Sequence, residues 1–241
     1  MPAAPWGWLI TSEELRSWIL EENAHWLVVN KPPLVVCHPS KCGPWSSLIG
    51  ACRQWTGCDP LHMPFRLDRE TSGVVLFAKD GATGRELQAA VARRRVSKTY
   101  YAVLSGNMTE PIEVDGPIGK HPASRVLMRR GVVPGGKQAR TLFLPVSRSR
   151  GFTLARVEPV TGRMHQIRVH AAHAGHPIVG DKIYGPDENL YIEFLKTGYT
   201  PLLAEKLLLN RQALHCSDVV FEDLGLSFHA PIPGDMLALC V

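Results

Sequence analysis

Asp68 is the residue whose neighbours in the sequence best suit chemistry. It lies between Arg66 and Arg69, and the apolar run 74–78 follows shortly after it. We expect this aspartate to stay ionised, because nearby positive charge favours its charged form. A carboxylate held just ahead of a buried strand is suited to nucleophilic work on a fixed scaffold. From these residues alone, the alternative is a surface ion pair that contributes little.

A second stretch, residues 162–181, brings four histidines close together in the sequence: His165, His170, His173 and His176. Histidines at this density raise the hypothesis of a metal site, and hence of a metal-dependent hydrolase. However, neither a His-Glu-x-x-His pattern nor a Cys pair accompanies them. We therefore do not expect a metal here.

Positive charge is concentrated in residues 116–157, which contain no Asp or Glu. The cations of this basic segment are Lys120, Arg125, Arg129, Arg130, Lys137, Arg140, Arg148, Arg150 and Arg156. The rest of the chain carries 18 Lys and Arg against 22 Asp and Glu. A block of one sign on an otherwise acidic chain indicates a surface for a polyanion, with a solvated basic loop as the alternative.

These residues must be positioned by secondary structure, and the run 74–78 is typical of a buried strand. We expect further strands at residues 26–29, 96–104, 152–160 and 219–221, with an extended piece at 34–39. Helices are expected at 11–22 and from Thr83, each with capping-box spacing, and at 46–55, 163–174 and 202–209. Within the strand 96–104, one of two consecutive tyrosines, Tyr100 and Tyr101, should face the core.

Length and composition are those of a soluble intracellular protein. The chain has 241 residues, 45% of them hydrophobic, without an apolar run near the ~20 residues of a membrane span. The six cysteines form no Cys-x-x-Cys pair, so neither a zinc ribbon nor a disulfide framework is expected. We expect no membrane association and place the protein in the cytoplasm.

The run Arg-Leu-Asp-Arg-x-Thr-Ser-Gly around Asp68, followed by an apolar strand and Lys79, resembles the catalytic motif of the RluA-type RNA pseudouridine synthases. Three further elements are similar to that family. They are Val-Val-Asn-Lys-Pro at residues 28–32, Lys-x-Tyr-x-Ala at 98–102, and Gly-Arg-x-His-Gln-Ile-Arg-Val-His followed by Gly-His-Pro-Ile-x-Gly-Asp at 162–181. One position departs from the pattern, because Phe65 stands where the family commonly has His.

The resemblance implies roles for individual residues. Asp68 is then the catalytic aspartate, Tyr100 stacks on the target uracil and assists proton removal from its C5, and Arg168 lies against the aspartate. Arg66 fills the space that a flipped-out nucleotide leaves. The expected RNA-binding residues include four cations of the basic segment. The full set is Arg66, Arg69, Arg93, Arg94, Arg95, Lys98, Arg129, Arg130, Lys137, Arg140, Arg163, His165 and Gln166.

The resemblance also implies an α+β fold with a bent, largely antiparallel mixed sheet, peripheral helices and a central basic cleft. The catalytic domain is expected at residues 24–241, after an N-terminal extension at 1–23 and without an S4-like domain. Isomerising uridine requires no redox change or group donor, so no cofactor is expected. We expect a monomer that acts on ribosomal or transfer RNA without a protein partner. The alternative is a catalytically inactive RNA-binding protein of the same fold.

Overall fold

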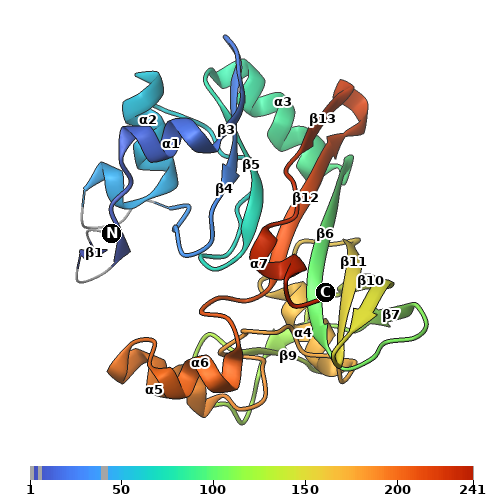
Figure 1. Ribbon diagram of the computed structural model, residues 1–241. Helices are drawn as coiled ribbons and strands as arrows, with labels where there is room; N and C mark the ends of the chain where they lie inside the picture. Colours follow the sequence, from blue (N-terminus) through green and yellow to red (C-terminus); the bar gives the residue numbers. More distant parts are fainter. Residues whose placement is uncertain (1–2, 5–6, 39–42, 241) are drawn as a thin grey trace. The chain divides into compact units, whose positions relative to one another are not determined.

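A computed structural model describes residues 3–4, 7–38 and 43–240, in which the chain forms two compact units (Figure 1). Unit 1 contains Met1–Lys98 and Cys216–Pro231, and unit 2 contains Thr99–His215 and Ile232–Val241. Two strands, β6 (Val96–Ser105) and β12 (Leu214–Phe221), carry the chain from one unit to the other. Unit 1 is therefore built from two separate parts of the sequence.

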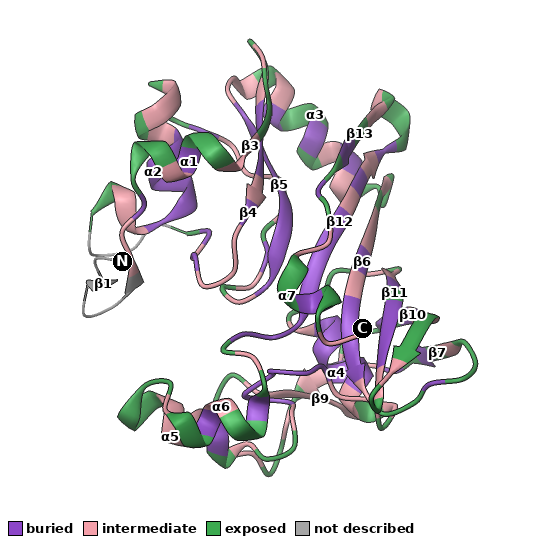
Figure 2. Ribbon diagram, in the orientation of Figure 1, coloured by how far each residue is buried: buried purple, intermediate pink, exposed green. Residues whose placement is uncertain are grey.

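Unit 1 is organised around β5 (Ser72–Ala78), in which every residue is buried (Figure 2). Antiparallel pairing joins β3 (Ile19–Glu22) to β4 (Trp26–Lys31), β4 to β5, and β12 to β13 (Leu226–His229). In the strand order, β5 lies between β4 and β12. The other elements of this unit are β1 (Ala3–Ala4), β2 (Gly7–Trp8), α1 (Ser12–Trp18), α2 (Leu48–Thr56), α3 (Gly81–Ala92) and two short 3-10 helices, Pro44–Ser46 and Glu222–Leu224.

The helix starts of unit 1 test the capping residues predicted from the sequence. The predicted capping box at Thr11 and Glu14 is confirmed, but α1 ends at Trp18, and residues 19–22 form a strand instead of continuing the helix. Backbone pairing with β4 outweighs the helical preference there. The cap predicted at Thr83 is wrong, because Asp80 accepts the N–H groups of Ala82 and Thr83 and starts α3 earlier.

The predicted extended piece at residues 34–39 is not a strand where the structure describes it. Leu34 has a positive φ of 70°, and no strand is assigned over residues 34–38. Pro39 lies outside the described residues, as does Cys42. No disulfide joins the five cysteines within the described part of the chain.

Unit 2 contains four antiparallel strands in the order β6–β11–β10–β7, so the first of them along the chain lies beside the last. Its strands are β7 (Ile112–Asp115), β10 (Arg140–Ser149) and β11 (Phe152–Pro159), with a separate hairpin of β8 (Ile118–Lys120) and β9 (Arg130–Val132). Its helices are α4 (Gln166–His173), α5 (Asn189–Thr197), α6 (Pro201–Leu207) and α7 (Gly234–Leu237). One core cluster joins Ile118, Val169 and Ile183, and a second joins α5 to α6 through Leu190 and Leu203.

The structure confirms the predicted α+β class with a largely antiparallel sheet and several helices. Residues 12–22 of the expected N-terminal extension contribute α1 and β3 to unit 1. The boundary at residues 23 and 24 and the basic cleft stay predictions. None of the described helices is both long and apolar enough to cross a membrane.

Candidate functional site

The turn that carries Asp68 is built against the start of β5. The N–H of Thr71 donates to the backbone oxygen of Asp68 at 3.1 Å, and Thr71 and Ser72 are both buried. Gly73 has a φ of 119°, and a Cβ at this position would lie 2.1 Å from the backbone oxygen of Cys216. Only glycine fits such a close approach, so the Thr-Ser-Gly sequence fixes where the strand begins. Asp68 is thus half-buried, just ahead of a buried strand, as predicted.

Lys31 holds this turn from the end of the neighbouring strand, β4. Its side chain is completely buried, and its Nζ donates to the backbone oxygens of Pro32, Val35 and Arg69 at 2.8, 2.9 and 3.0 Å. A buried ammonium is costly unless it is well hydrogen-bonded, so these contacts tie the 32–35 turn to the residue after Asp68. This role of Lys31 was not predicted from the sequence, although the residue lies within the Val-Val-Asn-Lys-Pro element.

The two arginines beside Asp68 are exposed and are held by residues 34–38. Arg69 Nε donates to the backbone oxygen of Leu34 at 3.2 Å. Arg66 contacts His38 Nε2 through Nη1, and burial together with the Arg66 charge lowers the pKa of His38. His38 therefore favours its neutral form, which can accept a hydrogen bond from the guanidinium. The role of Arg66 in filling a vacated space stays a prediction.

The aromatic ring of Phe65 is in contact with the ammonium group of Lys98. The Lys98 Nζ lies 3.6 Å from the centroid of the Phe65 ring, a cation–π contact. Burial lowers the pKa of Lys98 to about 8. The aromatic residue that replaces the family's common His is thus in contact with the Lys of the Lys-x-Tyr-x-Ala element. Both residues belong to unit 1.

Tyr100 and Tyr101 differ in burial, as the alternating strand pattern predicts. Tyr100 is 9% exposed and lies opposite Val157 of β11, whereas Tyr101 is only half-buried and lies opposite Arg156. The ring that matches the family's stacking tyrosine is therefore the buried one. Stacking on uracil stays a prediction.

Arg168 makes a buried, two-point ion pair with Asp181. Its Nε donates to Asp181 Oδ2 at 2.6 Å and its Nη2 to Oδ1 at 2.9 Å, with side chains 7% and 0% exposed. Burial alone would raise the pKa of Asp181, but the Arg168 charge and the N–H groups of Tyr184 and Ile183 keep it below its usual value. The resemblance to the family predicts Asp68 as the partner of Arg168. Because Asp68 belongs to unit 1 and Arg168 to unit 2, that pairing stays a prediction.

The residues before Arg168 support the loop that leads into α4. Gln166 is 4% exposed, and its Oε1 accepts from the Thr161 hydroxyl at 2.6 Å, while its Nε2 donates to the backbone oxygen of Arg140 at 2.9 Å. Arg163 Nε donates to the backbone oxygen of Gln138 at 3.1 Å. His165 has a positive φ of 57°, and its Nδ1 lies 2.8 Å from the Tyr184 hydroxyl. These contacts are structural, and RNA binding by these residues stays a prediction.

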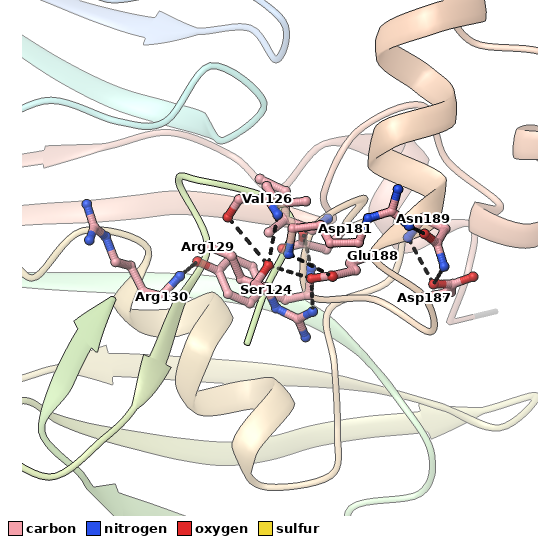
Figure 3. A network of polar contacts seen from close by, with 11 residues as sticks. Ser124, Val126, Arg129, Arg130, Asp181, Asp187, Glu188 and Asn189 are labelled. Atoms are coloured by element: carbon pink, nitrogen blue, oxygen red, sulfur yellow. Dashed lines mark hydrogen bonds and ion pairs between the residues drawn. The ribbon is translucent and has the colours of Figure 1, made fainter. Parts of the chain in front are cut away.

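Within the basic segment, the loop between β8 and β9 is held by Glu188 at the start of α5 (Figure 3). Glu188 Oε2 accepts from the Ser124 hydroxyl and from Arg129 Nη1, both at 2.6 Å, and Oε1 accepts from the Arg125 N–H at 3.2 Å. The hydrogen bonds from Ser124 and Arg129 lower the pKa of Glu188 to about 2. Arg129, predicted to bind RNA, is thus engaged by an acid 59 residues away in the sequence.

The other predicted RNA-binding cations differ in their surroundings. The Arg130 N–H donates to the Tyr184 hydroxyl at 2.8 Å, and Arg140 forms an exposed ion pair with Glu113 at 3.4 Å. Lys137 is exposed. After α3, Arg93, Arg94 and Arg95 are all exposed, and Arg95 is paired with Glu222 and Asp223 at 3.6 and 3.1 Å.

Of the four clustered histidines, three have described hydrogen-bond partners. His170 is completely buried, with its ring nitrogens 2.9 Å from the Thr141 hydroxyl and 3.0 Å from the backbone oxygen of Gly116, and burial lowers its pKa. His176 Nδ1 lies 2.9 Å from the backbone oxygen of Ser105, and His173 is exposed. Among the described residues, no three His, Cys, Asp or Glu side chains are arranged to hold a metal ion.

Comparisons with known proteins agree with this arrangement. Ribosomal large subunit pseudouridine synthase D of Haemophilus ducreyi is 34% identical over 234 residues, covering 92% of this chain and 69% of that protein. The Bacillus subtilis protein named uncharacterized RNA pseudouridine synthase YjbO is 36% identical over 230 residues, covering 92% and 74%. Among solved structures, human RNA pseudouridylate synthase domain containing 4 has a TM-score of 0.72 at 25% identity, covering 93% of this chain and 92% of that chain.

A match to the family RNA pseudouridylate synthase extends over residues 25–173, which include Asp68, Tyr100 and Arg168. This span is more than half of the chain, and the relatives cover most of the remainder. The chain therefore belongs to the RNA pseudouridylate synthase family, in its RluA-type branch.

Proposed function

We propose that this protein is an RNA pseudouridine synthase that converts uridine in RNA to its C5-glycoside. The observation that carries the proposal is the Asp68 turn. A half-buried carboxylate lies just ahead of the buried strand β5, in the motif that the family shares, and Lys31 and Gly73 fix the backbone around it. This placement supports an aspartate that performs covalent or proton-transfer chemistry from a fixed position.

The proposed reaction breaks the N–C glycosidic bond, turns the detached uracil and forms a C–C bond to the same ribose carbon. Substrate and product are isomers, so the proton lost from C5 is balanced by one gained at the ring nitrogen, and no group donor is consumed. Asp68 acts on the sugar or the base. Tyr100 stacks on the uracil, and Arg168 holds the aspartate in its reactive orientation. Because a base within a duplex is out of reach, the nucleotide is flipped out first.

The proposed substrate is a uridine in ribosomal or transfer RNA. The relatives named ribosomal large subunit pseudouridine synthase D favour ribosomal RNA as the first substrate to test. Exposed cations support binding to an RNA backbone, among them Arg93, Arg94 and Lys137. Affinity through such contacts is electrostatic and independent of sequence, so the choice of uridine rests with the residues around the flipped base.

The test is to compare the wild-type protein with Asp68→Asn on ribosomal and transfer RNA that lack pseudouridine. We expect the wild type to form pseudouridine at defined sites. The Asn variant should bind the same RNA with unchanged affinity and form none, because Asn keeps the shape but not the charge. Turnover by Asp68→Asn would show that Asp68 is not the catalytic residue. RNA binding by a wild type without turnover on either RNA would favour the inactive RNA-binding alternative.

A further inference from the structure

The loop between β8 and β9 contains a β-turn whose two corner residues are both apolar. The N–H of Arg129 donates to the backbone oxygen of Val126 at 2.9 Å, which places Leu127 and Met128 at the two central positions of the turn. Such positions most often hold Gly, Pro, Asn, Asp or Ser, because these residues suit the backbone of a turn. The turn itself therefore does not account for a Leu-Met pair at its corners.

Leu127 is the most exposed large hydrophobic residue in the described part of the chain. It is 81% exposed, whereas Met128 is 41% exposed and its Sδ lies 3.5 Å from the Tyr191 hydroxyl. One exposed leucine would need no explanation. However, Met164 is also 43% exposed, and its Sδ lies 3.5 Å from Nη2 of Arg130, which follows the turn. This side of unit 2 thus presents several apolar side chains together with cations.

The turn is fixed on both sides of its apolar corners. Before them, Val126 is 5% exposed and packs in the core of unit 2, and the Ser124 hydroxyl donates to Glu188 at 2.6 Å. After them, Arg129 Nη1 donates to the same carboxylate at 2.6 Å (Figure 3). Leu127 is therefore presented to solvent from a rigid base, and a contact made from such a base loses little conformational entropy on binding.

Positive charge surrounds the apolar corners. Glu188 pairs with one of the neighbouring arginines, Arg129, and Asp187 lies at the same helix start, where it accepts from the N–H of Asn189. These two acids are outnumbered, so the surroundings of the turn keep a positive charge. The cations closest to the turn in the sequence are Lys120, Arg125, Arg129 and Arg130.

An apolar residue among cations matches a ligand that presents flat apolar faces beside negative charges. RNA does so where its bases are unstacked in loops, bulges and ends. The turn belongs to the basic segment, which contains no acid, and this favours a polyanion over a protein surface of mixed charge.

We propose that the turn 126–129 is a wedge that contacts RNA bases: Leu127 packs against an unstacked base, and the surrounding cations bind the adjacent phosphates. This inference rests on the proposed function. It goes beyond that function by assigning a contact with a nucleobase to an apolar residue that lies in none of the four family-like elements of the sequence.

Two alanine variants separate the apolar contact from the ionic ones. The measurement is the Kd for large-subunit ribosomal RNA transcribed in vitro, at several salt concentrations. Leu127→Ala should weaken binding about 5- to 10-fold at every salt concentration, because losing an apolar contact changes no counterion release. Arg125→Ala should instead reduce the slope of log Kd against log salt by about one.

A rescue variant and a matched control complete the design. Leu127→Phe should bind RNA at least as tightly as the wild type, because an aromatic ring stacks on any base. Leu195 of α5 is the control, since it is another exposed leucine of unit 2, at 65%. Leu195→Ala should change neither the affinity nor its salt dependence. Thermal unfolding should give the wild-type Tm for all of these variants, because the substituted side chains are exposed.

Three results would overturn the inference. If Leu127→Ala binds RNA as tightly as the wild type, the apolar corner faces another partner, such as a protein or a second copy of this chain. If Leu127→Phe is as weak as Leu127→Ala, or if Leu127→Ala alters the salt slope, the loss reflects a displaced loop. If Leu195→Ala loses as much affinity, the effect is not specific to the turn.

Pseudouridine is quantified in the same RNA samples, so the proposed function is tested separately. A wild type whose RNA affinity depends on Leu127 but which forms no pseudouridine would refute the proposed function and support the wedge. Pseudouridine formation together with an affinity that is independent of Leu127 would refute the wedge alone.

Discussion

Replacing Arg168 by Met should destabilise the protein strongly, because the substitution leaves the carboxylate of Asp181 buried and charged without a cation to pair with. Removing one member of a buried pair typically costs about 3–5 kcal/mol. Because the Asp181 side chain is 0% exposed, we expect a cost in the upper half of that range. For a chain of this length each kcal/mol lowers Tm by about 2–4 °C, which gives a fall of about 8–20 °C at neutral pH.

A double-mutant cycle separates this electrostatic cost from the loss of packing. In Arg168→Met/Asp181→Asn the remaining side chain is neutral and its Oδ1 can still accept the two backbone N–H groups. We therefore expect the double variant to be more stable than Arg168→Met by at least about 2 kcal/mol. Guanidinium unfolding followed by far-UV circular dichroism measures all four corners of the cycle. Additive losses would refute the reasoning, since they would mean that the two residues do not stabilise each other.

The pH dependence gives a second check with a defined sign. In the wild type the pKa of Asp181 is lowered, so its contribution to stability is complete above the pKa of an unfolded Asp and is lost as the pH falls through the folded value. In Arg168→Met, burial raises that pKa instead, so the variant gains stability as the pH falls. The stability difference between the two proteins should narrow from neutral pH to about pH 4. A stability difference that does not change with pH would contradict the assignment of Asp181 as the buried charge that loses its cation in Arg168→Met.

Four further predictions concern RNA binding and the surrounding surface. Replacing the exposed Arg93 and Arg94 by Ala should reduce the slope of log Kd against log salt by about 2, roughly one for each phosphate that is no longer neutralised, whereas the ion-paired Arg95 should contribute less. RNA affinity should fall as the pH rises through about 8, because Lys98 loses its proton there, and Lys98→Arg should abolish this fall. Glu188→Gln should release the loop that contains Arg125 and Arg129, and limited digestion with trypsin should then cleave it faster than in the wild type. Turnover should survive exhaustive chelation; a metal whose removal abolishes activity would restore the hydrolase hypothesis.

Local signals in the sequence were sufficient to predict the strand after Asp68, the capping box of α1 and the burial of Tyr100. Each depends on residues a few positions apart, where apolar periodicity and capping chemistry act directly. The end of α1 was predicted wrongly because β4 supplies a backbone partner that the helix pattern does not reveal. Likewise, Asp80 and Thr83 are both capping residues, and their spacing alone did not show which one starts α3.

The interactions that hold the site together were harder to predict, because they join distant parts of the sequence. Lys31 binds the backbone at Arg69, and Glu188 binds Arg129, 38 and 59 residues away. Asp181 was visible within the Gly-His-Pro-Ile-x-Gly-Asp element, but only folding brings it to Arg168. The lack of acids within the basic segment also does not reveal that some of its cations pair with acids elsewhere in the chain, such as Arg140 with Glu113.

The composition of unit 1 from two separate parts of the chain has a consequence for folding. During synthesis, residues 1–98 emerge well before residues 216–231, so β5 lacks its neighbour β12 until most of the chain has been made. A mostly apolar strand with an unpaired edge is prone to aggregation, and closing a long loop is slow even though its entropic cost grows only with the logarithm of its length. All six tryptophans lie within residues 1–98. We therefore expect completion of unit 1 to be a late folding event that tryptophan fluorescence follows directly.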